Sequence, residues 1–112
     1  MIATLALVLA GSAAFAGAVG GPKSANERVD ANGADRYEIS FRGGERAEVI
    51  VDGDGDTDLD LYIYDESGNL IVKDDDNTDY CICRWTPKWT GKFTIRIVNR
   101  GSVYNEYTIR TN

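Results

Sequence analysis

The sequence predicts an all-β protein, an antiparallel β-sandwich of about seven to eight strands. From Arg36 onward, apolar and polar residues alternate over short runs, which is the two-residue period of half-buried strands. Turn-forming stretches rich in Gly, Asn and Asp separate these runs at short intervals. No helical period competes with this pattern, and closely spaced short strands typically fold into a sandwich or a related barrel.

The first 33 residues precede the strand pattern. Residues 1–16 carry no charged side chain and end in Ala-Phe-Ala at 14–16, the small–x–small pattern that signal peptidase reads. We therefore expect a cleaved signal peptide and a secreted or periplasmic protein. The usual positive charge after Met1 is missing, so a retained anchor is the alternative. Residues 17–33 have no sustained period and are predicted to be a linker.

The first four predicted strands follow in order. Three of them, RYEISF at 36–41, AEVIV at 47–51 and LDLYIY at 59–64, place an apolar residue at every second position. The fourth, LIVK at 70–73, follows the turn DESGN at 65–69, where Gly and Asn tolerate positive φ.

Three more strands complete the expected domain, which spans residues 34–112. They are YCICRW at 80–85, FTIRIV at 93–98 and VYNEYTIRT at 103–111. Pro87 falls in the loop before the sixth strand, where its missing N–H removes no ladder hydrogen bond.

The chain is acidic, with a formal net charge of −6, and it contains no histidine. Nucleic-acid binding needs clustered Lys and Arg, so we expect no nucleic-acid partner, and no membrane partner after signal cleavage. Without His, triads built on Ser–His or Cys–His are excluded, and we expect no enzyme. A glycosidase using the carboxylates of Asp58 and Asp60 is the catalytic alternative. Acidity suits a bound cation or a basic partner.

The two cysteines, Cys81 and Cys83, share one face of the fifth predicted strand. Residues i and i+2 of a strand lie about 6.6 Å apart, near the upper limit for Cα atoms joined by a disulfide. A bridge between them therefore needs a bend or a bulge. The alternatives are two small apolar core residues, or one intermolecular disulfide in an oxidising compartment.

The stretch VDGDGDTDLDLYIYD at 51–65 carries aspartate at five alternate positions from Asp52 to Asp60. Calcium prefers such hard oxygen ligands, six to eight of them. An EF-hand loop does not fit, because its required Gly and Glu are absent and the flanks are predicted strands. Asp58 and Asp60 belong to the polar face of the strand, so their geometry should be better fixed than that of the preceding loop residues.

A hairpin brings a second acidic run toward the first. If the third and fourth strands pair around the turn at 67–68, Asp60 faces Asp75 and Asp58 faces Asn77. Nine carboxylates then crowd one end of the sheet. Like charges opposite each other destabilise a sheet, so either a bound cation or solvent exposure must relieve the repulsion.

Two segments, GDTDLDLYIYDESGNLIVKDDD at 55–76 and TGKFTIRIVN at 90–99, resemble the bacterial pre-peptidase C-terminal (PPC) domain. The resemblance covers roughly residues 34–112 and extends distantly to collagenase collagen-binding domains. It implies a jelly-roll-like β-sandwich without catalytic activity, here standing alone behind a signal peptide. Some relatives bind calcium and extracellular polymer, and Asp35 is the position most like the family's acidic residue before the first strand.

These observations define the expected sites. Calcium is the expected cofactor, and its candidate ligands are Asp58, Asp60, Asp56, Asp54, Asp75, Asp76 and Asp35. Large aromatic residues in a small sandwich usually belong to the core, but they can also line a binding face. The candidate binding surface consists of Trp85, Trp89 and Tyr104.

The expected function is that of a secreted, non-catalytic binding or accessory module whose partner is an exported protein or an extracellular polymer. The alternative is a small structural or interaction subunit, linked by an intermolecular disulfide and without metal. The oligomeric state does not follow from the sequence.

Overall fold

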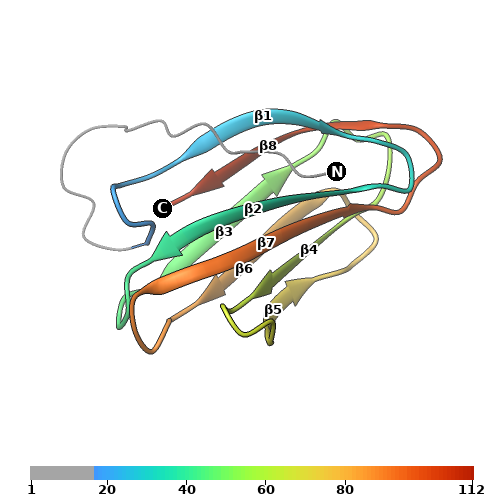
Figure 1. Cartoon of the computed structure of the whole chain (residues 1–112). Coiled ribbons are helices and arrows are strands. Elements are labelled where there is room, and N and C mark those ends of the chain that lie inside the picture. The colour runs from blue at the N-terminus through green and yellow to red at the C-terminus, as the bar shows by residue number, and fades with distance from the viewer. Residues whose placement is uncertain (1–16) are drawn as a thin grey trace.

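The computed structural model describes residues 17–112, and the predicted signal peptide lies outside this range. The described chain consists of eight strands joined by turns and loops (Figure 1). The strands are β1 (Ser24–Val29), β2 (Ala34–Phe41), β3 (Ala47–Asp52), β4 (Leu59–Tyr64), β5 (Leu70–Asp74), β6 (Tyr80–Trp85), β7 (Gly91–Asn99) and β8 (Asn105–Thr111). Within this range, no helix is long and apolar enough to cross a membrane.

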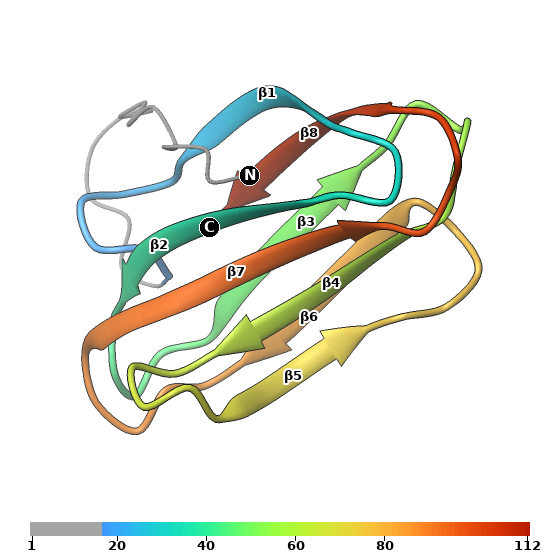
Figure 2. The same cartoon turned by 45° about the vertical axis from the view of Figure 1, so that its right-hand side comes forward.

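The strands form two four-stranded antiparallel sheets that face each other (Figure 2). Their orders are β1-β8-β3-β6 and β2-β7-β4-β5. Except in the β4–β5 hairpin, strands that are neighbours in a sheet are far apart in the sequence, because the chain crosses repeatedly from one sheet to the other. This is the connectivity of a jelly roll. The predicted all-β, jelly-roll-like sandwich is therefore confirmed.

The core lies between the sheets and contains the apolar stripes that the sequence predicts. On β2, Tyr37, Ile39 and Phe41 are all buried, and the alternate residues of β3, β4 and β7 behave in the same way. One end of the core is closed by Trp85, whose ring packs edge-on against Phe41 with 4.9 Å between the centroids. The alternation of apolar and polar residues in the sequence therefore predicts correctly which face of each of these strands is buried.

The first strand is absent from the sequence prediction, which placed residues 17–33 in a linker. That prediction is wrong for β1, which pairs along its whole length with β8. Only Val29 of this edge strand is buried, so SANERV shows no apolar alternation. Backbone hydrogen bonds to β8 hold it, and these leave no mark on side-chain patterning.

The β4–β5 hairpin has the predicted register from Leu61 to Ile63, and a shift of one residue then places Tyr64 opposite Leu70. Leu61 lies opposite Asp74, and Tyr62 lies opposite Lys73. The same register would place Asp60 opposite Asp75, but the ladder stops at Asp74.

Both cysteines are free thiols buried in the core. Desolvation raises the pKa of Cys83 to about 12 and shifts the pKa of Cys81 upward as well. The prediction of small apolar core residues is confirmed. An intermolecular disulfide through either residue is wrong for the folded chain, because neither sulfur reaches the surface.

Candidate functional site

The acidic loop between β3 and β4 is organised by one buried side chain, Asn105, at the start of β8. Its Nδ2 donates to the carbonyl and hydroxyl oxygens of Thr57 at 3.3 and 3.1 Å and to Asp79 Oδ2 at 3.1 Å. Its Oδ1 accepts the backbone N–H of Asp54 at 3.1 Å. One amide therefore ties together the β3–β4 loop, the β5–β6 loop and β8.

Several aspartates in the β3–β4 and β5–β6 loops accept hydrogen bonds from backbone N–H groups. Asp54 accepts from the amides of Asp56 and Glu106, at 3.0 and 2.8 Å. Asp79 accepts from the amide of Gly55 at 2.6 Å, and Asp76 accepts from the amide of Thr78 at 3.0 Å. These carboxylates hold turns in place, which is a common role of Asp in loops.

Asp60 on β4 forms an ion pair with an arginine. Arg100 Nε donates to Asp60 Oδ2 at 2.7 Å, and its Nη2 donates to the hydroxyl of Tyr62 at 3.1 Å. The other oxygens, Asp58 Oδ1 and Asp60 Oδ1, are buried and accept no hydrogen bond from the described residues. Desolvation, then the neighbouring carboxylates of Asp60 and Asp76, raises the pKa of Asp58.

These residues do not form a ready calcium cage. Within residues 17–112, no group of three or more Cys, Asp or Glu side chains is arranged to hold a metal ion. Asp75 is paired with Lys73 at 2.8 Å. Asp35 lies in the core, where its Oδ2 accepts the hydroxyl of Tyr107 at 2.6 Å. Calcium needs six to eight oxygens, and calcium binding stays a prediction.

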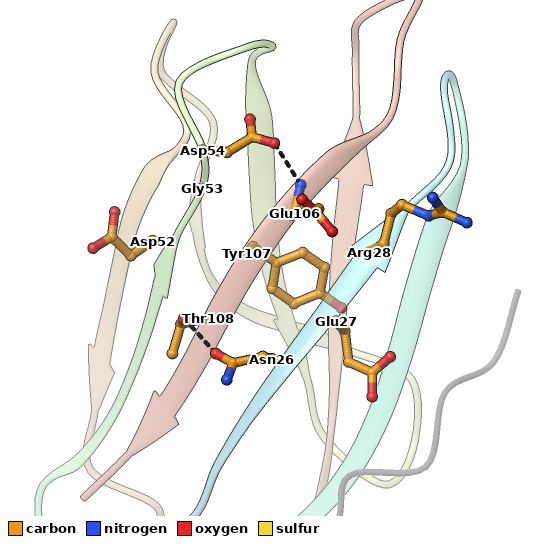
Figure 3. A pocket seen from close by; sticks show the side chains of 9 residues that line it. All are labelled: Asn26, Glu27, Arg28, Asp52, Gly53, Asp54, Glu106, Tyr107 and Thr108. Carbon is orange, nitrogen blue, oxygen red and sulfur yellow. Dashed lines mark hydrogen bonds between the residues drawn. The ribbon is translucent and has the colours of Figure 1, made fainter.

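A groove of about 660 Å³ runs over β1, β8 and the end of β3 (Figure 3). We call it the acidic groove, because four carboxylates and a single arginine are among the residues that line it. It is lined by Asn26, Glu27, Arg28, Asp52, Gly53, Asp54, Glu106, Tyr107 and Thr108. Its volume lies within the usual range of ligand sites, roughly 300–1,000 Å³.

The three aromatic candidates do not form one surface. Trp85 packs into the core, with its ring 5.4 Å from that of Phe93. Trp89 is 75% exposed in the β6–β7 loop. Tyr104 is half-exposed in the β7–β8 loop, at the opposite end of the molecule, where Arg28 of the acidic groove lies 4.8 Å over its ring. Trp89 and Tyr104 therefore belong to separate surfaces.

The sequence analysis missed Asn105, Arg100 and Arg28. Arg100 lies in the NRGS turn and Asn105 lies near it, but their partners are 26 to 51 residues away in the sequence. Only a correct arrangement of β3, β4 and β8 brings each of them to its partner.

Comparisons with known proteins show the fold. The chain resembles Aeromonas hydrophila PliG, a periplasmic inhibitor of g-type lysozyme, with a TM-score of 0.64 and 12% identity over 99% of this chain and 96% of that one. It also resembles the pre-peptidase C-terminal domain of Bacillus anthracis collagenase, with a TM-score of 0.58 and 12% identity over 80% and 89% of the two chains. A third neighbour, the Yersinia pseudotuberculosis-derived mitogen, has a TM-score of 0.55 and 13% identity over 81% and 84%.

No protein-family model matches the chain, and no curated protein sequence matches it. The similarity to the collagenase structure confirms the resemblance to the PPC domain at the level of the fold.

Proposed function

We propose that this chain is a non-catalytic β-sandwich module that acts outside the cytoplasm and binds a basic surface of another exported protein. The acidic groove is the docking site. The observation that carries the proposal is its charge: the carboxylates of Glu27, Asp52, Asp54 and Glu106 line the groove, and Arg28 is the one cation among its lining residues.

The groove is held in a defined shape. Hydrogen bonds fix Asp54 to the amide of Glu106, and Thr108 donates to the amide oxygen of Asn26 at 2.7 Å, which joins β8 to β1. A rigid acidic surface attracts a basic partner over a distance and orients it during encounter. Such a surface needs no rearrangement on binding, which lowers the entropic cost of association.

The neighbours support an exported binding module. PliG is a periplasmic inhibitor that acts on another protein, and its structure aligns with almost the whole chain. The collagenase PPC domain is part of a protease. Together with the predicted signal peptide, they favour a secreted or periplasmic location and a protein partner.

Calcium remains a proposed cofactor of this end of the molecule. It is supported by the two buried carboxylate oxygens of Asp58 and Asp60 that lack a hydrogen-bond partner among the described residues. The guanidinium of Arg100 already balances one of these charges.

The test measures binding of the purified protein to a panel of basic exported proteins and to a g-type lysozyme, together with inhibition of that lysozyme. The double variant Asp52→Asn/Glu106→Gln removes two charges from the groove. We expect its association rate at low salt to fall about tenfold, because long-range attraction speeds encounter. The control is Glu38→Gln, which removes one charge from the outer face of the other sheet, and it should keep the wild-type rate.

A basic partner whose association rate is the same for the wild type and the groove variant would contradict the proposal. So would the absence of binding across the whole panel.

A further inference from the structure

We propose a second binding site, for a carboxylate-bearing polysaccharide, on the outer face of the β2-β7-β4-β5 sheet. This face belongs to the other sheet from the acidic groove, so the proposal goes beyond the protein-binding function. We call the site the Arg–Trp strip and define it by Arg36, Arg96, Tyr64, Glu66, Lys92 and Trp89.

The strip begins with two arginines that face each other. Arg36 on β2 lies directly opposite Arg96 on β7, and both side chains are exposed. Neither takes part in the ion pairs found within residues 17–112. Like charges directly opposite each other destabilise a sheet. The carboxylates of Glu38, Asp65 and Glu66 line the same hollow, and an anionic group bound between the two guanidinium groups would relieve their mutual repulsion directly.

The arginines line one end of a hollow of about 300 Å³, which also touches Tyr64, Thr94 and Glu66. Two guanidinium groups on neighbouring strands, about 4.8 Å apart at the backbone, present paired N–H donors. Guanidinium binds carboxylate through two parallel hydrogen bonds, so a carboxylate matches this end of the strip.

A second hollow of about 100 Å³ continues the strip toward the end of the sheet. The two hollows share Asp65 and Glu66, and the second is bordered by Lys92 and Trp89. Because Arg96 and Lys92 are four residues apart on β7, the strip is roughly 13 Å long between them. An extended polymer fits this shape better than a single small anion.

Trp89 is 75% exposed, yet its loop is held firmly. The amide of Gly43 donates to the Thr90 hydroxyl at 3.0 Å, and the amide of Gly44 donates to the Pro87 carbonyl at 2.7 Å. A Cβ atom at Gly43 would lie only 2.3 Å from the Trp89 Cα, so glycine permits this close approach. An exposed indole on a fixed backbone offers a flat apolar face on which a sugar ring can stack.

The carboxylates along the strip decide between a polysaccharide and an acidic peptide. Glu38, Asp65 and Glu66 line the same hollow as the two arginines. The side chains of an acidic peptide offer these carboxylates no hydrogen-bond donors. The hydroxyl groups of a sugar instead donate hydrogen bonds to carboxylates. The combination of paired arginines, acceptors and an indole therefore fits a uronic-acid polymer.

The test measures binding of the full chain to polygalacturonate by titration calorimetry. We compare its fully methyl-esterified form, which has the same backbone without charge, and poly-L-glutamate. We expect esterification and the Arg36→Gln/Arg96→Gln pair each to weaken binding by about tenfold or more, because charge-assisted hydrogen bonds are lost. Trp89→Ala should weaken it by about tenfold as well, and Arg110→Gln on the other sheet should leave it unchanged.

A separate readout checks the unliganded protein. Arg36→Gln should raise the melting temperature by about 1–4 °C, because it removes one of two opposed charges. A rise would show that this substitution does not weaken binding by unfolding the protein. No binding of polygalacturonate would overturn the proposal, and so would equal affinity for the esterified polymer or for poly-L-glutamate. Binding that survives the arginine substitutions would overturn it as well.

Discussion

A chain of three buried polar groups crosses the core, and removing its central hydroxyl tests how the two sheets are joined. Tyr107 on β8 donates to Asp35 Oδ2 at 2.6 Å. The Tyr37 and Tyr107 hydroxyl oxygens are 2.5 Å apart, and since the proton of Tyr107 is used on Asp35, Tyr37 must be the donor. None of the three side chains is more than 3% exposed, and Asp35 Oδ1 has no partner among the described residues.

The substitution Tyr107→Phe removes both hydrogen bonds, so Asp35 loses its donor and the Tyr37 hydroxyl loses its acceptor. One bond to an acidic group and one between neutral hydroxyls together contribute about 2–4 kcal/mol. For a domain of this size, each kcal/mol lowers the melting temperature by about 4–8 °C. We therefore expect a fall of roughly 8–32 °C. Tyr37→Phe removes only the terminal donor and should cost about 0.5–1.5 kcal/mol.

The pH dependence separates a charge effect from simple loss of packing. Desolvation raises the pKa of Asp35, and the hydrogen bond from Tyr107 opposes that rise. The carboxyls of Glu27 and Asp30 push the pKa of Asp35 up as well. A folded-state pKa above the unfolded value means that the folded state binds more protons. The stability that this group contributes is therefore complete below the unfolded pKa and is lost as pH rises through the folded pKa.

Without the Tyr107 hydroxyl, the pKa of Asp35 rises further and the loss at neutral pH becomes larger. Thermal unfolding of the wild type, Tyr107→Phe and Tyr37→Phe, followed by circular dichroism between about pH 4 and pH 8, measures this. We expect the deficit of Tyr107→Phe to grow with pH and that of Tyr37→Phe to stay constant. Equal melting temperatures for the two variants, or a Tyr107→Phe deficit independent of pH, would refute the reasoning.

Three further predictions concern the acidic end and the thiols. Arg100→Gln exposes Asp60 to its neighbouring carboxylates, so millimolar calcium should raise its melting temperature by several degrees more than that of the wild type. An equal calcium response would show that Arg100 does not occupy the cation's place. Asn105→Ala should cost about 2–4 kcal/mol and speed amide exchange at Gly55, whereas an unchanged exchange rate would mean that the loop is organised without it. Cys81 and Cys83 should react with a thiol reagent only on unfolding; rapid labelling of the native protein would contradict their burial.

The sequence predicted most of the fold because most strands bury one face. On β4, Leu59, Leu61 and Ile63 are all fully buried, and their alternation with polar residues predicted this without any tertiary information. The hairpin register also followed from local rules, because a short turn leaves few ways to pair β4 with β5. The edge strand β1 was not predictable in the same way. Its pairing with β8 connects residues more than 75 positions apart at its Val29–Asn105 end.

The candidate site was predictable in part. The two acidic runs do meet: the amide of Gly53 donates to the Asp79 carbonyl at 2.9 Å, and that of Leu59 donates to the Thr78 carbonyl at 3.3 Å. The sequence could not reveal what relieves the repulsion, because the answer lies in distant residues. Backbone amides, Asn105 and Arg100 take up much of the acceptor capacity that a bound cation would otherwise occupy.

The separation of the two proposed sites follows from the architecture. Side chains on the outer faces of the two sheets point in opposite directions, and the core between the sheets holds them about 10 Å apart at the backbone. The acidic groove can therefore attract a basic protein while Arg36 and Arg96 face away from it. The net charge of −6 does not reveal that the two faces differ in charge, because it sums a carboxylate-rich groove and a strip that contains both carboxylates and unpaired arginines. A jelly roll of this size can thus carry two surfaces of different chemistry, and a change on one face should leave the other intact.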